Sequence, residues 1–239
     1  MPPPSPRSLV PLGPTFLSPR GNATEVLLVR HGQQESVADA TTVEQRVNPP
    51  LSPTGRRQAK VVAAALADED ITAVYTSKLS RARDTGAAIA AHHDLDAEEV
   101  DGIEEIGLFR DATPDRSRGV AAYERFRAGA GAYFARERRW DVYPLSESSA
   151  DFRRRVVTGI EGIVATHPGE TVVVACHGGV INTYLGWLLG LQQDMWFHAS
   201  HASISRFRAL GDQRALISCN ERAHLVVADP ALVTHDAIG

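Results

Sequence analysis

The sequence predicts an α/β protein, a three-layer α/β/α sandwich built on a mainly parallel, doubly wound sheet. Two observations lead to this fold class. Short apolar runs with β-branched residues alternate with longer segments that begin at helix-capping residues. The apolar runs are hydrophobic at nearly every position, as expected of strands that helices cover on both faces.

The first strand and the first helix come early in the chain. Val26–Val29 is short, apolar and partly β-branched, which is typical of a buried strand. A Pro-rich turn follows, and after it comes the segment LSPTGRRQAKVVAAALADED. Either Ser52 or Thr54 is able to cap a helix there, and this helix is expected to run to about Ala67.

The middle of the chain repeats this pairing. Residues 71–77, ITAVYTS, are the second expected strand, and a second helix is expected from about Ser80. Another short strand is expected around Glu98–Asp101. The segment Tyr123–Arg139 has helical character despite two internal glycines, so a further helix is expected there.

The last third contains the most hydrophobic strand. A capped amphipathic helix is expected from about Ser148, and its apolar stripe consists of Phe152, Val156, Ile160, Ile163 and Val164. The run TVVVAC at residues 171–176 predicts a fully buried strand, and a helix is expected after it over Val180–Leu189. Residues 203–210 and 214–221 alternate in polarity, which predicts two final strands.

The composition limits the partners of this protein. The 239 residues are enough for one large domain, which we expect over residues 23–239 after a disordered, Pro-rich tail at 1–22. The net charge of −4 and the pI near 6.1 argue against a general nucleic-acid or membrane-surface binder. No apolar run approaches the roughly 18 residues of a membrane span. Two cysteines make no disulfide framework and suit a reducing cytosol, so a cytoplasmic protein is expected.

Candidate functional residues follow three of the expected strands. Ligands of parallel sheets bind beyond the carboxyl ends of the strands, so functional side chains should lie just after them. His31 follows the first strand, Arg81 lies in the loop after the second, and His177 follows TVVVAC. Each of them alone also fits an ordinary packing or surface role, since arginine is abundant here and only two of the 25 basic residues are lysines.

These residue types suit a site that attacks a phosphate monoester. Such a site must cancel nearly two negative charges, supply a nucleophile and protonate the departing oxygen. Arg30 and Arg81 would hold the phosphate, because a guanidinium binds two phosphate oxygens at once. Neutral His31 would attack phosphorus, and neighbouring cations would keep it unprotonated. His177 would donate a further hydrogen bond.

Glycines follow both histidines. Gly32 would let its backbone N–H approach an equatorial phosphate oxygen, and Gly178 would give similar backbone access after His177. Phosphoryl transfer of this kind requires positioning and charge cancellation, so neither a metal nor a cofactor is expected. The histidine spacings match no compact metal-ligand set, and two nearby arginines would repel a cation.

Five motifs occur in an order that resembles the histidine phosphatase superfamily, in its phosphoglycerate mutase-like branch. They are LVRHG, YTSKLSRARDTG, IEEIG, SESSAD and VVVACHGGVI. The resemblance covers residues 25–225. It implies a phosphohistidine intermediate on His31 and a phosphoryl group held by Arg30, Arg81 and His177.

The resemblance also implies an acid/base carboxylate within GIEEIG. The family pattern assigns Glu105, with Glu104 as the alternative if the loop is shifted. The negative charge of a phosphate dianion raises the pKa of a neighbouring carboxyl group. The carboxyl group is then able to protonate the leaving oxygen. The chain departs from the family at three positions: Gln34 stands where Ser or Thr is common, Val37 where Asn is common, and His201 where Asn is usual. Gln33, Gln34 or another loop residue would have to replace the missing phosphate hydrogen bond, and Gln34 is the one expected to bind substrate.

The sequence therefore predicts a metal-independent phosphatase whose partner is a small phosphorylated metabolite, with no nucleic acid and no membrane. A phosphoglycerate mutase-type phosphotransferase is the alternative, although the segment between Glu105 and Glu147 is only moderate in length and lacks the mutase pattern. A catalytically idle member that binds a phosphorylated ligand is a third hypothesis. A homodimer stays open, because Trp187, Trp196 and Phe197 would suit either an interface or the core.

Overall fold

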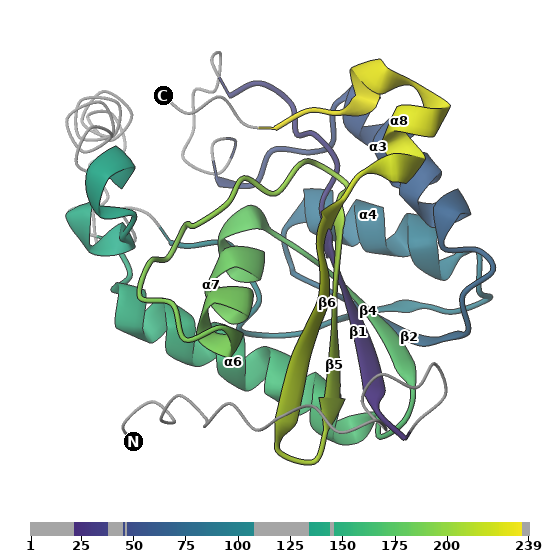
Figure 1. The fold of residues 1–239 in the computed structure, drawn as a ribbon. Helices are drawn as coiled ribbons and strands as arrows, with labels where there is room; N and C mark the ends of the chain where they lie inside the picture. The colour runs from purple at the N-terminus through teal and green to yellow at the C-terminus, as the bar shows by residue number, and fades with distance from the viewer. Residues whose placement is uncertain (1–21, 38–44, 46, 108–133, 144–145, 236–239) are drawn as a thin grey trace.

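The computed structural model describes residues 22–37, 45, 47–107, 134–143 and 146–235. The expected tail therefore lies outside the described residues, apart from Asn22. The same holds for most of the expected helix Tyr123–Arg139, of which residues 134–137 are helical. The described part forms one mixed α/β layer structure in which a central sheet carries helices on both faces (Figure 1).

The sheet has six strands in the order β3-β2-β4-β1-β5-β6. In chain order they are β1 (Thr24–Arg30), β2 (Ile71–Thr76), β3 (Ala97–Glu99), β4 (Thr171–Cys176), β5 (Ile204–Leu210) and β6 (Gln213–Glu221). The pairs β1–β4, β4–β2 and β2–β3 are parallel, whereas β5 and β6 are added antiparallel beside β1. The fold class is the expected one, with a parallel core and an antiparallel edge.

Helices cover the two faces of the sheet separately. The helices are α3 (Pro53–Ala65), α4 (Ser80–Ala90), α6 (Ser149–Thr166), α7 (Gly178–Leu188) and α8 (Ala223–Ala228), with short 3-10 turns at Trp140–Val142 and Pro230–Leu232. One apolar cluster joins α6 and α7 to the sheet, and a second joins α3, α4 and α8 to the other face. Figure 1 shows the two groups on opposite sides of the strands. The residues between them, such as Leu27 and Leu28, alternate between the two clusters.

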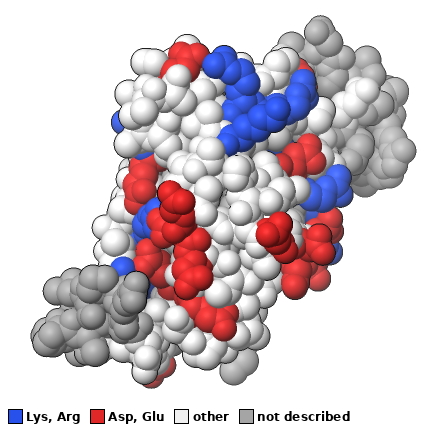
Figure 2. All heavy atoms as spheres, turned by 90° about the vertical axis from the view of Figure 1, so that its right-hand side faces the viewer, with Lys and Arg blue, Asp and Glu red and all other residues white. Residues whose placement is uncertain are grey.

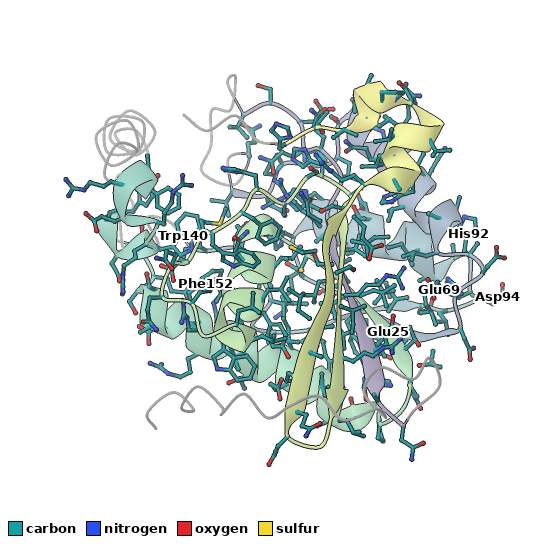
Figure 3. All side chains as sticks on the ribbon, viewed as in Figure 1. Glu25, Glu69, His92, Asp94, Trp140 and Phe152 are labelled. Atoms are coloured by element: carbon teal, nitrogen blue, oxygen red, sulfur yellow. The ribbon has the colours of Figure 1, made fainter. Side chains whose placement is uncertain are left out.

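Local sequence signals set the helix boundaries. The side chain of Ser52 accepts a hydrogen bond from the Gly55 N–H, so Ser52 and not Thr54 caps α3. Ser148 caps α6 in the same way through the Asp151 N–H. The whole expected stripe of α6 is buried against the sheet and α7. In Figure 3, Phe152 and Trp140 lie on this side of the sheet.

Two element boundaries and one additional helix differ from the expectations. The third strand ends at Glu99 and does not reach Asp101, because the chain turns at Gly102, whose φ is +90°. Helix α7 begins at Gly178, two residues before the expected start, so both glycines belong to its first turn. Helix α8 was not expected at all, since its six residues are too few for a periodic signal.

The three aromatic residues for which both an interface and the core were open are partly buried and pack against the core: Trp187, Trp196 and Phe197. The expected homodimer stays a prediction. No helix within the described ranges has the length and apolarity that crossing a membrane would take. On the face seen in Figure 2, basic side chains form a connected patch near the top, and most of the acidic side chains gather below it.

Candidate active site

The parallel register of β1 and β4 brings two of the predicted residues together. Arg30 is paired with Cys176, the last residue of β4, and the His31 N–H donates to the Cys176 carbonyl at 2.9 Å. The next residues, His31 and His177, therefore leave the sheet side by side, with ring centroids 5.1 Å apart. Two segments that are far apart in the sequence therefore meet at one point, as expected of residues that directly follow parallel strands.

The hydrogen bonds of His31 fix which ring nitrogen carries the proton. Nδ1 lies 2.7 Å from the Gly32 carbonyl oxygen, which only accepts, so Nδ1 is the protonated nitrogen. Nε2 is then left with its lone pair, and the Arg81 Nε–H donates to it at 3.2 Å. A neutral imidazole in this tautomer offers Nε2 as the nucleophile.

Burial lowers the pKa of His31 well below its ordinary value, because a charged ring would lose its hydration. The positive charge of Arg81 acts in the same direction, and the charges of His177 and Arg30 add smaller effects. Only 2% of the His31 residue surface is exposed. The ring is therefore held unprotonated at neutral pH.

The two predicted arginines are anchored at backbone carbonyls. Arg30 Nη1 donates to the Ala199 carbonyl at 2.5 Å, and Arg81 Nη1 donates to the Val47 carbonyl at 3.2 Å. Both residues are 5% exposed. Arg81 lies in the first turn of α4 rather than in the loop before it, because the helix already begins at Ser80. A rigid helix therefore positions its guanidinium against the imidazole.

His177 has one ring nitrogen engaged and one available. Nε2 lies 2.9 Å from the Ser77 hydroxyl oxygen, whereas buried Nδ1 has no hydrogen-bond partner among the described residues. Burial lowers the pKa of His177 well below its ordinary value, and the charges of Arg81 and Arg30 lower it further. An unpartnered buried nitrogen in a cationic site suggests a ligand that supplies the missing bond.

The two glutamates of GIEEIG point to different places. Glu105 Oε2 accepts from the Gly179 N–H at 3.1 Å, which puts its carboxylate at the N-terminus of α7, two residues after His177. Glu104 Oε2 instead accepts from the Gly102 N–H at 2.9 Å, within its own loop. A helix N-terminus favours a negative charge. The geometry therefore favours Glu105 as the carboxylate of the site.

Comparison with known proteins identifies the family. The profile of the histidine phosphatase superfamily (branch 1) matches residues 26–222. The chain belongs to this superfamily. It is 33% identical over 218 residues to the uncharacterised protein Rv0525 of Mycobacterium tuberculosis, a match that covers 87% of this chain and 97% of the relative.

A second relative and a solved structure are also similar to this chain. The chain is 30% identical over 168 residues to a metal-independent phosphoserine phosphatase of Arabidopsis thaliana, which covers 66% of each protein. The solved structure of Bacillus stearothermophilus YhfR superposes with a TM-score of 0.70 at 20% identity, covering 84% of this chain and 99% of the other. At that identity the structural match supports the fold alone.

Gly32 of this histidine phosphatase has a different role from the one expected. Its N–H donates to the Thr85 hydroxyl at 3.1 Å, and that hydroxyl donates to the Arg81 carbonyl at 2.7 Å, so the N–H does not face a substrate. Glycine is required because a Cβ there would overlap the Gly55 carbonyl. A Cβ on Gly178, by contrast, would make an ordinary contact 3.5 Å from Arg30 Nε.

The predicted role of Gln34 stays a prediction. Its backbone forms an isolated antiparallel bridge with Leu51, and the residue is half-buried. The neighbouring Gln33 is used structurally, since its N–H donates to the Gln58 side chain at 2.7 Å and its Oε1 accepts from the Ser52 hydroxyl at 2.9 Å. These bonds fix the loop that follows the nucleophile.

Two residues that line the site were not predicted from the sequence. Ser77 directly follows β2, so the strand-end rule could have found it as the partner of His177. His201 was seen only as a departure from the family, yet its ring lies 5.8 Å from that of His31 and is 2% exposed. Its Nδ1 contacts the Thr234 hydroxyl at 2.9 Å, which joins the site to the C-terminal segment.

The part of the chain that the structure describes contains no group of three or more metal-ligating side chains. The groups whose charges act on the His31 ring are two guanidinium groups and two further imidazoles. Such a site is complementary to a small, multiply charged anion.

Proposed function

We propose that this protein hydrolyses small phosphate monoesters through a phosphohistidine intermediate on His31, with Glu105 as general acid and base. The observation that carries the proposal is the state of the His31 ring. A carbonyl holds its Nδ1 proton, so the Nε2 lone pair faces the Arg81 guanidinium. Neutral imidazole kept unprotonated by neighbouring cations is a nucleophile suited to phosphorus.

The reaction would proceed in two steps. In the first, His31 Nε2 attacks phosphorus, the P–N bond forms, and the bond to the leaving oxygen breaks while the Glu105 carboxyl group protonates that oxygen. In the second, water attacks phosphorus and gives its proton to Glu105. The P–N bond breaks, the electron pair returns to Nε2, and inorganic phosphate leaves. The carboxyl group is therefore restored after each turnover.

Charge cancellation would come from the protein alone. Arg30 and Arg81 supply two positive charges against the phosphate dianion, and the Nδ1 side of His177 is free to bind a phosphate oxygen. The Arg81 Nε–H, which donates to His31 Nε2, would instead donate its hydrogen bond to a phosphate oxygen when Nε2 attacks phosphorus. A metal cation would be repelled by these charges, so we propose a metal-independent reaction.

The substrate class is suggested by the plant relative. Its name, metal-independent phosphoserine phosphatase, supports hydrolysis of a small phosphate monoester rather than transfer within a phosphoglycerate. Phosphoserine is accordingly the first physiological candidate to assay, beside the general substrate p-nitrophenyl phosphate.

The proposal is tested by phosphate release from p-nitrophenyl phosphate, phosphoserine and 3-phosphoglycerate by wild type and His31→Ala. We expect release by the wild type with added chelator, and its loss in the variant. The matched control is His92→Ala, because this exposed histidine lies after α4, far to the side of the sheet in Figure 3.

Three outcomes would contradict the proposal. Phosphate release that survives in His31→Ala would refute the nucleophile. Isomerisation of phosphoglycerate faster than hydrolysis would replace the phosphatase with a mutase. Tight phosphate binding with no turnover of any substrate would make the protein a binding module.

A further inference from the structure

We propose that Arg155 is a positioning residue for Glu105 and that Glu147 fixes Arg155 in turn; the proposal rests on the acid/base role proposed for Glu105. Glu147 belongs to the SESSAD motif, residues 146–151. Arg155 lies on α6, the helix that packs beside α7 in Figure 1. Together they would hold the acid loop, residues 102–107, against the start of α7.

Arg155 binds three carbonyls of the acid loop with one guanidinium. Nη1 donates to the carbonyls of Gly102 at 2.9 Å and Glu104 at 2.7 Å, and Nη2 donates to that of Glu105 at 3.2 Å. These residues form an irregular segment after β3, with no strand or helix to fix them. Because the three bonds diverge from one planar group, they determine the position and the orientation of the loop.

Glu147 holds Arg155 and also the far end of the loop. Its Oε1 accepts from Arg155 Nε at 2.7 Å and its Oε2 accepts from Nη2 at 2.8 Å, a two-pronged ion pair. The side chains of Glu147 and Arg155 are only 8% and 19% exposed. The Glu147 N–H donates to the Gly107 carbonyl at 3.1 Å. The centroid of the Phe152 ring lies 4.6 Å from the guanidinium carbon of Arg155. Hydrogen bonds therefore hold the acid loop at its beginning, through Arg155 and Gly102, and at its end, through Glu147 and Gly107.

The position of the loop matters because the Glu105 carboxylate accepts one hydrogen bond within the loop and one from α7. Oε1 accepts from the Ile106 N–H at 2.9 Å within the loop, and Oε2 accepts from the Gly179 N–H at 3.1 Å on α7. The bond to Ile106 moves with the loop, whereas the bond to Gly179 persists only while the loop keeps its place relative to α7. A shift of about 1 Å in a catalytic group is enough to cost on the order of 100-fold in rate. Arg155 would prevent that shift without touching the substrate.

The test compares substrates whose leaving groups differ in their need for a proton. The leaving p-nitrophenolate is stable as an anion, whereas the serine alkoxide of phosphoserine must be protonated. The ratio of kcat/KM for these two substrates reports on general acid catalysis in the phosphoryl-transfer step. Arg155→Lys keeps the charge but loses the planar fork, and Glu147→Gln keeps the size but loses the ion pair. Arg154→Gln is the matched control, since this neighbour is half-exposed and pairs with Asp151.

The Glu105→Gln variant shows how far the ratio of kcat/KM values changes when the general acid is removed. We expect it to lower kcat/KM for phosphoserine by about 100- to 10,000-fold and to affect p-nitrophenyl phosphate much less. Arg155→Lys and Glu147→Gln should change the ratio in the same direction by about tenfold or more, and Arg154→Gln should leave it unchanged. Adding Arg155→Lys to Glu105→Gln should cause little further loss, because both changes remove one function.

The outcomes separate this proposal from the proposed function. If Glu105→Gln shifts the ratio but the folded Arg155→Lys and Glu147→Gln proteins lose both substrates equally, Arg155 is only structural and the proposal fails. Additive losses in the double variant would overturn it as well. If Glu105→Gln itself leaves the ratio unchanged, the acid assignment fails first, and the positioning role fails with it.

Discussion

Gly179→Ala should separate the activity of this histidine phosphatase from its stability. A Cβ on Gly179 would overlap Glu105 Oε1 and lie 3.1 Å from the carboxyl carbon. The obstructing atoms are the end of a flexible side chain, so the carboxylate would yield by about 1 Å while the helix stays in place. A displacement of that size predicts a loss of about 100-fold in kcat/KM for phosphoserine.

Stability should change in the opposite direction. Alanine is favoured over glycine within a helix by about 0.8–1.0 kcal/mol, so the variant should be no less stable than wild type in urea unfolding. Gly162→Ala is the matched control. It lies within α6 and its added Cβ would meet nothing within 4 Å, so it should gain similar stability and keep full activity. Wild-type turnover of phosphoserine by folded Gly179→Ala would refute the geometry assigned to Glu105.

Three other predictions concern the groups around the site. Stability should fall as the pH drops below 6.5, because unfolded His31 and His177 take up protons that the folded state excludes; the expected slope is about 1.4 kcal/mol per pH unit for each. Thr85→Val should cost about 1–3 kcal/mol by leaving the buried Gly32 N–H unpaired. Phe152→Ala should cost about 3–5 kcal/mol, since this fully buried ring packs in the core. Urea unfolding measures all three.

Each of these has a contradicting result. The lowered pKa of His177 would be contradicted if the His177→Asn variant lost stability below pH 6.5 as steeply as wild type. An undiminished midpoint for Thr85→Val would show that water or another group satisfies the glycine N–H. A cost below about 1 kcal/mol for Phe152→Ala would mean that α6 contributes little to the core.

Much of the site followed from the sequence because strand ends and helix caps have local signals. The apolar runs before His31 and before His177 predicted buried strands. A parallel sheet brings the carboxyl ends of such strands to one edge. The capping residue Ser148 likewise indicated where α6 begins. The family pattern assigned Glu105 and kept Glu104 as the alternative. The coordinates add that the Glu105 carboxylate accepts from the Gly179 N–H, whereas that of Glu104 accepts from the Gly102 N–H.

Other features depend on contacts between distant segments. The packing of Gly32 against Gly55 and its bond to Thr85 join three separate elements, so no local pattern indicates them. His201 reaches the site through the segment that precedes β5, on the antiparallel side of the sheet. Antiparallel strands carry no rule that places ligands at their ends, which is why its position was not foreseen.

The most direct test of the central claim is to trap the phosphorylated protein. Wild type should be mixed with phosphate-labelled substrate, quenched in the steady state, and mapped by peptide mass spectrometry under alkaline conditions that preserve phosphohistidine. The account predicts an acid-labile phosphate on the peptide that contains His31, more abundant in Glu105→Gln on p-nitrophenyl phosphate because the second step lacks its base. Label on any other residue, or turnover with no labelled protein at all, would contradict it.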